Sequence, residues 1–188
     1  MSAPVRILPG EYHVGGGDVV ITTLLGSCVS ACIWDPVTGI GGMNHFMIPN
    51  PGGPAIDATR LGETNAARYG IFAMEHLINA ILLAGGDRRR LQAKLVGGGK
   101  VIKGNMTIGD DNIDFARAYL EVEGLPIVSE RVGGWCARRV SFRPGTGEAR
   151  VYELATDEAV ACRDAAYARR VAQTAPANEI ELFWEDRA

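Results

Sequence analysis

Short apolar runs separated by glycine-containing turns dominate the first third of the chain, and this pattern predicts β-strands. β-Branched and apolar residues fill positions 19–25 and 28–34, and a third run covers 40–48. The turn-forming sequence Asp35-Pro-Val-Thr-Gly39 lies between the last two runs, so they are predicted to pair as a β-hairpin. Within the third run, Gly41-Gly42 indicates a bulge or a close approach of two backbones.

Helical periodicity appears later in the chain and alternates with further strand patterns. Helices are expected at about 65–84, before Gly85-Gly86, and from 110 or 111 to 123, before Gly124. Further strands are expected at 91–96, 127–130, 138–143 and 149–154, the last two as a hairpin. This order predicts a single α/β (α+β) domain over residues 1–154, with mostly antiparallel local pairing.

Glycine usage changes abruptly after this body. All 24 glycines lie at or before Gly147, whereas the last 41 residues contain none and hold 11 alanines. Residues 155–188 are therefore expected to form a C-terminal helical extension, with a helix at about 156–174 capped by Thr156. Its thin apolar stripe, Val160, Tyr167 and Val171, predicts packing on the surface of the domain. The alternating segment 179–184 is expected to be a short edge strand or a docking tail.

Charge and composition exclude several classes of function. The net charge is −3, so no broad basic surface for nucleic acid is expected. No run reaches the ~20 apolar residues of a membrane helix, and the N-terminus lacks a signal-peptide core, which predicts a cytoplasmic protein without membrane insertion. Gly97-Gly-Gly-Lys100 is not a complete phosphate-binding loop, and the histidines and cysteines lack metal-ligand spacing. Neither a cofactor nor a metal is expected.

The predicted hairpin brings a cysteine and a histidine near each other. A nucleophilic cysteine needs a base within hydrogen-bonding reach. If Trp34 pairs with Ile40, Cys28 faces Phe46, and a shift of one residue, as a bulge or a shorter turn produces, places Cys28 directly opposite His45. This spacing predicts a Cys–His dyad at the open end of the hairpin.

The residues just before the cysteine support the same interpretation. The Gly26-Ser27 turn leaves the Cys28 thiol accessible and offers backbone N–H groups to a developing oxyanion. A purely structural alternative stays open, because cysteine is often buried and Cys28 can pack with Cys32 on one strand face. The residues alone do not decide between the two interpretations.

The runs Thr22-Thr-Leu-Leu-Gly-Ser-Cys-Val-Ser-Ala-Cys-Ile-Trp-Asp-Pro36 and Gly41-Gly-Met-Asn-His-Phe-Met-Ile-Pro49 closely resemble the CheD family, the chemoreceptor glutamine deamidases of bacterial chemotaxis. The likeness covers residues 5 to 153 and includes Ile108-Gly109-x-x-Asn112 and Gly133-Gly134-x-x-Ala137-Arg138. The resemblance implies a nucleophile at Cys28, a base at His45 and an orienting hydroxyl at Thr22, six residues before the cysteine. The choice of Thr22 over Thr23 rests on the family alone.

The resemblance also implies a fold and a reaction. The fold is a layered β-sheet sandwich with helices on its outer faces, similar to cysteine hydrolases such as toxin deamidases. The reaction converts glutamine side chains on the cytoplasmic helices of chemoreceptors to glutamate through a thioester, and a CheC-type response-regulator phosphatase is an expected partner. Two alternatives are a transglutaminase-like or protease-like thiol enzyme and a non-catalytic adaptor for such a phosphatase. Retention of Thr22, Cys28 and His45 argues against a pure adaptor.

Overall fold

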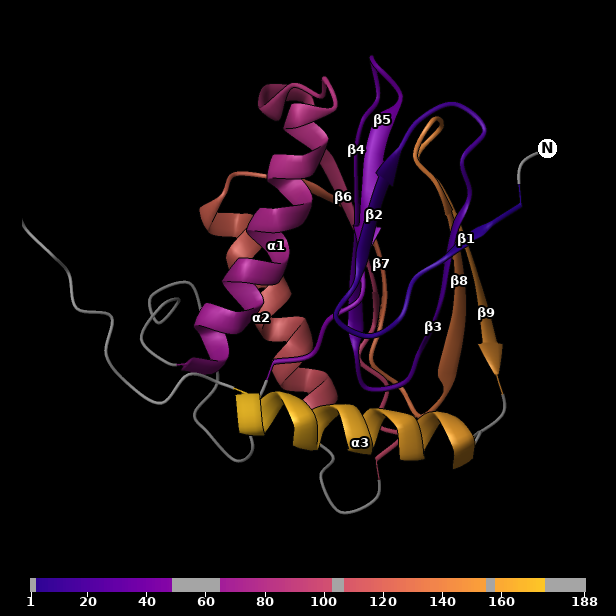
Figure 1. Ribbon diagram of the computed structural model, residues 1–188, viewed down its shortest axis with the longest axis vertical. Coiled ribbons are helices and arrows are strands. Elements are labelled where there is room, and N and C mark those ends of the chain that lie inside the picture. The colour runs from indigo at the N-terminus through magenta and orange to yellow at the C-terminus, as the bar shows by residue number, and fades with distance from the viewer. Residues whose placement is uncertain (1–2, 49–64, 103–106, 155–157, 175–188) are drawn as a thin grey trace, which may run out of the picture.

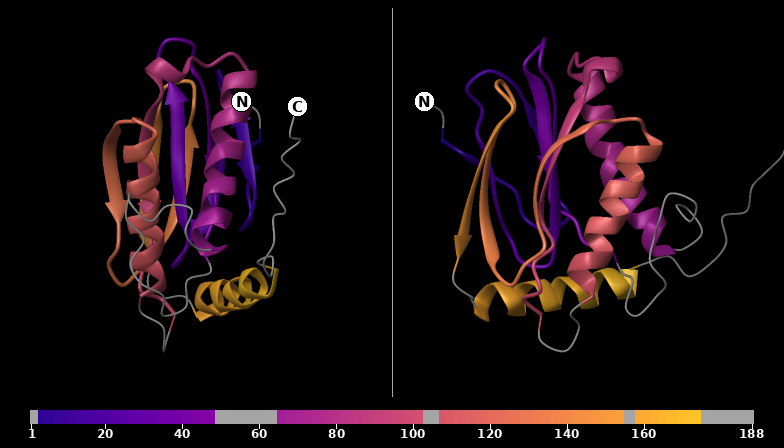
Figure 2. Two further views of the ribbon diagram at one scale, coloured as in Figure 1. Left: turned by 90° about the vertical axis from the view of Figure 1, so that its left-hand side faces the viewer. Right: turned by 180° about the vertical axis from the view of Figure 1, so that it is seen from behind.

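Two β-sheets face each other, and two helices cover the free face of one of them (Figure 1). The computed structural model describes residues 3–48, 65–102, 107–154 and 158–174. One sheet has five strands in the order β2-β5-β4-β6-β7, and the other has four in the order β1-β3-β8-β9. The described chain forms a single α/β domain of three layers, with α3 lying across one end of them (Figure 2).

The two sheets draw their strands from all parts of the body. The five-stranded sheet contains β2 (Tyr12–Gly15), β5 (Ile40–Asn44), β4 (Val29–Asp35), β6 (Gln92–Gly97) and β7 (Ile127–Val132). The four-stranded sheet contains β1 (Val5–Arg6), β3 (Ile21–Leu25), β8 (Ala137–Arg143) and β9 (Glu148–Leu154). The helices are α1 (Asn65–Leu83), α2 (Ile108–Val122), α3 (Glu158–Thr174) and the short 3-10 helix η1 (Arg88–Arg90).

The predicted elements of the body are confirmed to within a few residues at their ends, and β1 and β2 were missed. These two strands have two and four residues, too few for an apolar period to show. The expectation of helices on both outer faces is wrong: α1 and α2 lie together over the five-stranded sheet (Figure 1). Within the described residues, no helix covers the outer face of the four-stranded sheet. Thr156 and segment 179–184 lie outside the described residues.

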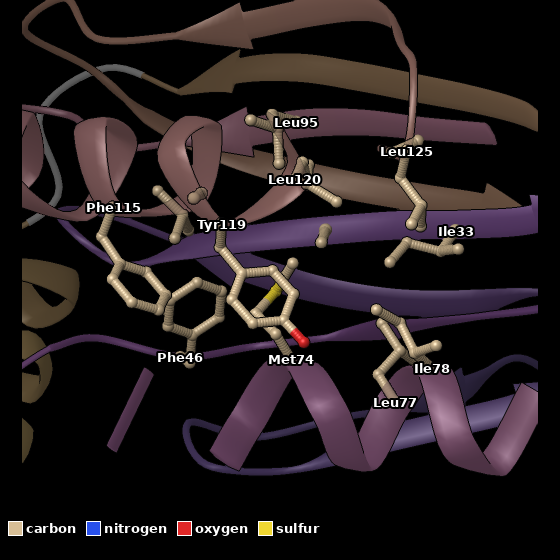
Figure 3. Packing of buried hydrophobic residues seen from close by; sticks show 14 of the residues in the cluster. Ile33, Phe46, Met74, Leu77, Ile78, Leu95, Phe115, Tyr119, Leu120 and Leu125 are labelled. Carbon is tan, nitrogen blue, oxygen red and sulfur yellow. The ribbon is translucent and has the colours of Figure 1, made fainter. Parts of the chain in front are cut away.

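Two apolar layers hold the domain together. One lies between α1, α2 and the five-stranded sheet, where Phe46 and Phe115 pack edge to face with ring centroids 5.9 Å apart (Figure 3). The other lies between the two sheets and contains Cys28, Cys32, Met43, Val140 and Phe142 among others. Side chains alternate between these layers along β4, since successive residues of a strand point to opposite faces. Cys28 therefore points toward the four-stranded sheet and Val29 toward the helices.

The register of the β4–β5 hairpin differs from the predicted one. Trp34 pairs with Gly41, and an isolated bridge joins Val29 to Phe46, so one register holds along the hairpin. It is shifted by one residue from the Trp34–Ile40 pairing, in the direction opposite to the one that places Cys28 across from His45. The expected bulge at Gly41-Gly42 is absent from this pairing, but the close approach is confirmed. A Cβ on Gly41 stands 2.4 Å from the Ile33 carbonyl oxygen, so only glycine fits here without displacement.

Candidate active site

Cys28 and His45 share the space between the two sheets at the end of the domain nearest α3. Continuing the observed register sets His45 opposite Ser30 and Met47 opposite Cys28. Opposed residues of a strand pair share a face, so Cys28 and His45 are diagonal neighbours on the face turned to the four-stranded sheet. Both side chains are fully buried, with 0% of their surface exposed. The two residues share one face as predicted, but they are not directly opposed, the thiol is not accessible, and among the described residues His45 Nε2 has no hydrogen-bond partner.

Asn44 turns the backbone away from β4 just before His45. Its Oδ1 accepts a hydrogen bond from the Ala31 amide at 2.8 Å, in place of a backbone carbonyl of β5. The His45 backbone bonds on its other side, donating to the Glu11 carbonyl at 2.9 Å and accepting from the Gly10 amide at 2.7 Å. The position of His45 is thus set by the N-terminal segment as well as by its own hairpin.

The His45 ring is oriented by Thr23, which lies on β3 of the opposite sheet. Thr23 Oγ1 stands 2.8 Å from His45 Nδ1 and donates its proton to the Ile7 carbonyl at 2.9 Å. A hydroxyl has one proton, so toward the ring Thr23 accepts, and Nδ1 carries the hydrogen. Nε2 is left with a bare lone pair, and it is buried without a hydrogen-bond partner. Burial, with a smaller contribution from Arg163, lowers the pKa of His45 to about 3, so the imidazole is neutral.

Thr22 does not take the role that the family resemblance implies. Its hydroxyl donates to the Val5 carbonyl at 3.5 Å on the other face of β3. Thr23 shares the inner face with Ile21 and Leu25, because alternate residues of a strand point the same way. The hydroxyl that contacts His45 therefore belongs to Thr23, one position later than expected.

Backbone contacts fix the turn that carries Cys28. The Gly26 carbonyl accepts from the Gly99 amide at 2.7 Å, and the Cys28 carbonyl accepts from the Gly98 amide at 2.8 Å. Gly97, with a φ of +116°, leaves no room for a side chain, since a Cβ there stands 2.3 Å from the Cys28 carbonyl oxygen. The glycines at the end of β6 and just after it thus bind the turn before β4 through backbone contacts, and they do not form a phosphate loop.

Asn112 of α2 joins the two halves of the candidate site. Its Nδ2 donates to the Ser27 carbonyl at 2.8 Å, and its Oδ1 accepts from the Ile48 amide at 2.7 Å. Ser27 precedes the cysteine, and Ile48 follows the histidine by three residues. One fully buried side chain therefore joins the turn before Cys28 to the segment after His45.

With these carbonyls engaged by the scaffold, the Ser27 amide is turned toward α3. It donates at 2.7 Å to Oδ2 of Asp164, and the Ser27 hydroxyl donates to the same oxygen at 3.1 Å. The turn thus already binds a negatively charged oxygen, which is what an oxyanion site must do. Burial and the Asp164 carboxylate raise the pKa of the Cys28 thiol well above its ordinary value, so the thiol is protonated here.

A small pocket reaches His45 from the surface between β2 and α1. It encloses about 90 Å³, and Tyr12, Asn44, His45, Tyr69 and Phe72 are among its lining residues. Phe72 is 60% exposed, so the rim of this pocket is aromatic. An apolar rim over a buried polar group is typical of a binding cleft.

Comparison with known proteins identifies the family. The family model described as CheD chemotactic sensory transduction matches residues 47–153. A protein of Hahella chejuensis is 44% identical over 181 residues, covering 95% of this chain and 84% of its own length. Proteins of Burkholderia vietnamiensis and a Caulobacter species are 45% and 46% identical over 95% of this chain and 74% and 92% of theirs. All three are named probable chemoreceptor glutamine deamidase CheD.

This chain belongs to the CheD family. The family model begins to match at residue 47, after Cys28 and His45, and ends before α3. The matches to the three relatives leave out 5% of the 188 residues, about nine, so they include Cys28 and His45 and extend through α3. The extension is therefore shared with CheD relatives beyond the part that the family model describes.

Sequence reasoning missed Thr23, Asn112 and Asp164 as parts of the CheD site. Asn112 stands in the quoted motif Ile108-Gly109-x-x-Asn112, which was a usable signal without an assigned role. Strand alternation favours Thr23 only once the inner face of β3 is known. Asp164 lies 137 residues from Ser27, and no local pattern announces that contact.

The other cysteines lie in different environments from Cys28. Cys32 is buried in the core between the sheets, while Cys136 is half-buried and Cys162 exposed. In the part of the chain that the structure describes, no three His, Cys, Asp or Glu side chains gather to hold a metal ion. None of the described helices has the length and apolar character needed to cross a membrane.

Proposed function

We propose that this chain converts glutamine side chains of chemoreceptors to glutamate, with Cys28 as nucleophile and His45 as general base and acid. The observation that supports this proposal most directly is the Thr23–His45 hydrogen bond. It leaves the lone pair of His45 Nε2 without a hydrogen-bond partner, on the same face of the sheet as Cys28. The names of the relatives supply the substrate class. The residues supply the mechanism, in which Thr23 is a positioning residue.

The first half of the reaction forms a thioester. The Cys28 proton passes to His45 Nε2, and the thiolate sulfur attacks the carboxamide carbon of the glutamine. The carbonyl oxygen becomes an oxyanion, for which the Ser27 N–H is the proposed donor next to Gly26. When the tetrahedral intermediate collapses, the C–N bond breaks, and the His45 imidazolium gives its proton to the leaving ammonia. A γ-glutamyl thioester of Cys28 remains.

The second half releases glutamate. A water molecule loses a proton to His45 Nε2 as its oxygen bonds to the thioester carbon. The C–S bond then breaks, and the proton on His45 returns to the sulfur of Cys28. The sum consumes one amide and one water and gives one carboxylic acid and one ammonia. The neutral glutamine becomes an anionic glutamate on the receptor.

The charge state of the pair decides how the reaction begins. In the buried site the thiol is protonated and the imidazole neutral, since the thiol pKa is raised and the His45 pKa is lowered. Proton transfer therefore accompanies nucleophilic attack, as in the Ser–His pair of serine hydrolases, and a stable thiolate–imidazolium pair does not precede it. The likeness of the layered sandwich to cysteine hydrolases is part of this proposal.

The reaction is expected to take place in the cytoplasm, where the receptor helices that serve as substrate lie. The CheC-type phosphatase remains a predicted partner. A transglutaminase-like reaction shares the thioester and differs in the acceptor, because an amine replaces water in the second half. Adding a primary amine to the assay separates the two products by mass.

Peptide mapping of a chemoreceptor cytoplasmic fragment by mass spectrometry tests the proposal. The wild-type chain is expected to replace specific glutamine amides by carboxyl groups, and Cys28→Ala is expected to lower the rate at least about 10³-fold. Cys32→Ala is the matched control, because it removes a second buried thiol from the same face of β4 and should retain most activity. Unchanged glutamines with the wild type on several receptors, or full activity of Cys28→Ala, contradict the proposal.

A further inference from the structure

The nucleophile is closed off in this structure. Cys28 and Asp164 are 0% exposed and Ser27 is 2% exposed. With these residues buried, a glutamine side chain on another protein cannot reach the sulfur of Cys28. Some part of the fold must therefore move before the proposed reaction begins, and the contacts of α3 identify that part.

The helix α3 is the element that covers the turn before Cys28. Oδ2 of Asp164 and Cγ1 of Val160 stand 2.5 and 3.1 Å from the position of a Cβ on Gly26. Arg163 Nη2 donates to the Leu24 carbonyl at 2.6 Å. In Figures 1 and 2 the yellow helix crosses the end of the sheets at which β3 leads into β4.

We propose that α3 is an intrasteric inhibitor of this enzyme: it lies in the place of the substrate's own helix, with the Asp164 carboxylate seated on the Ser27 donors as a mimic of the glutamate product. This inference rests on the proposed function. The product of deamidation is a carboxylate one methylene longer than that of Asp164, carried by a helix of the receptor. Asp164 therefore presents to the site the group that glutamate presents after turnover.

The chemistry of the contact supports inhibition over catalysis. The Ser27 N–H that is proposed to hold the oxyanion is already bonded to Asp164. Burial, with a further contribution from the same carboxylate, raises the pKa of the Cys28 thiol and keeps it protonated. Nη2 of Arg163 stands 3.2 Å from Oδ1 of Asp164 and compensates part of the charge, which makes the buried carboxylate tolerable in the closed state. In the closed state α3 therefore blocks access to Cys28 and helps to keep its thiol in the less reactive, protonated form.

The attachment of α3 is suited to release. Among its described residues, the buried apolar side chains are Val160, Tyr167 and Val171, besides partly buried alanines. The apolar layer between α1, α2 and the five-stranded sheet contains no residue of α3, whereas Tyr167 and Val171 belong to the layer between the two sheets. Release of the helix therefore opens the second layer, which contains Cys28, and leaves the first intact. Tyr167 also reaches α1, with its hydroxyl 2.8 Å from that of Tyr69. A receptor helix that competes for the same turn displaces α3 and uncovers Cys28.

The test measures two quantities on the full chain. The first is the rate at which iodoacetamide alkylates Cys28, followed by peptide mass spectrometry with the exposed Cys162 as internal reference. The second is the rate of glutamine deamidation in a receptor fragment. The variants are Asp164→Ala, which removes the carboxylate, and Val171→Ala, which weakens the docking of α3 but keeps the carboxylate. Arg169→Ala is the control, because it removes a charge from the exposed face of the same helix.

Both variants are expected to raise the alkylation rate of Cys28 about tenfold and to raise the deamidation rate, whereas Arg169→Ala matches the wild type. Unchanged alkylation in both variants overturns the proposal. Faster alkylation in Asp164→Ala alone also overturns it, since the carboxylate then acts through charge and not through the cover. Faster alkylation with slower deamidation in both variants assigns α3 to the substrate site and rejects inhibition. A further outcome separates the two proposals. If both variants alkylate faster but neither they nor the wild type deamidate any receptor, the proposed function is wrong, while the conclusion that α3 covers Cys28 is retained.

Discussion

The hydroxyl of Thr23 connects the two sheets at His45, the proposed base, standing 2.8 Å from His45 Nδ1 while it donates to the Ile7 carbonyl. One side chain of the four-stranded sheet thus sets the tautomer of a histidine carried by the five-stranded sheet. The arrangement parallels the role of the third residue in a catalytic triad, with a neutral acceptor in place of a carboxylate.

The first prediction concerns the choice between the two threonines. Thr23→Val removes the acceptor while keeping the shape, and kcat is expected to fall about 100-fold because His45 loses its orientation. Thr23→Ser keeps the hydroxyl and should restore most of the rate. Thr22→Val is the matched control on the other face of β3, and its kcat should stay near that of the wild type. A large loss in Thr22→Val with little in Thr23→Val reverses the assignment.

The second prediction concerns stability in acid. The pKa of His45 is about 3 in the folded chain and near 6.5 when unfolded, so between these values the unfolded chain binds a proton that the folded chain excludes. The contribution of His45 to stability is fully present above its pKa in the unfolded chain, and it is lost as the pH falls toward its pKa in the folded chain. Between pH 7 and pH 5 this group should remove about 2 kcal/mol of unfolding free energy. Urea unfolding at both pH values measures it.

The control for the acid effect is His45→Gln. Every carboxylate is unchanged in that variant, so the difference between the two chains isolates the histidine. The variant should lose clearly less stability than the wild type over the same pH interval. Equal losses in the two chains mean that His45 does not exclude a proton in the folded state.

The third prediction concerns the Asn112 side-chain amide, which joins the two segments that carry Cys28 and His45. Asn112→Ala leaves the Ser27 carbonyl and the Ile48 amide without their partner, which is expected to cost about 1–3 kcal/mol of stability. Deamidase activity should fall further than the loss of folded protein explains, because both segments gain freedom. Asp114→Ala, on the exposed side of α2, is the control for helix substitution. Thermal unfolding and activity per folded molecule separate the two effects.

The fourth prediction concerns the glycine that touches the nucleophile's own carbonyl. Gly97→Ala places a Cβ against the Cys28 carbonyl oxygen in addition to straining a positive φ, so it should cost more than about 2 kcal/mol and lower activity. Gly17→Ala is the matched control: its φ is also positive, at +59°, but no atom lies within 4 Å of the added carbon. It should cost about 1 kcal/mol and leave activity intact. Equal effects on activity would show that Gly97 acts through strain alone.

The hairpin that carries Cys28 and His45 was predictable because its signals are local. Apolar runs on either side of Asp35-Pro36 define two strands and a turn, and a hairpin brings their ends together. The register was not predictable from the same residues. It depends on the turn and on Asn44, whose side chain replaces a backbone acceptor. A shift of one residue changes every opposed pair, although Cys28 and His45 remained near each other.

The positioning residues were unpredictable for a different reason. Thr23 contacts His45, which lies 22 positions later in the chain, and Asp164 contacts Ser27, which lies 137 positions earlier. Each contact joins two separate elements of the fold. Apolar periodicity shows which face of an element is buried but not which element covers it. The thin stripe of Val160, Tyr167 and Val171 is the buried face of α3, while nothing in it revealed that this face covers the turn before Cys28.

The pairing of β3 with β8 has a consequence for the order in which the enzyme matures. Thr23 pairs with Val140 there, so the strand that orients His45 gains its long partner only after about three-quarters of the chain has been made. Contacts so distant in sequence form late and slowly during folding. A nascent fragment that ends before β8 carries Cys28, Thr23 and His45 and still lacks an oriented base. The Thr23–His45 contact is therefore expected to become fixed only after β8 has been made.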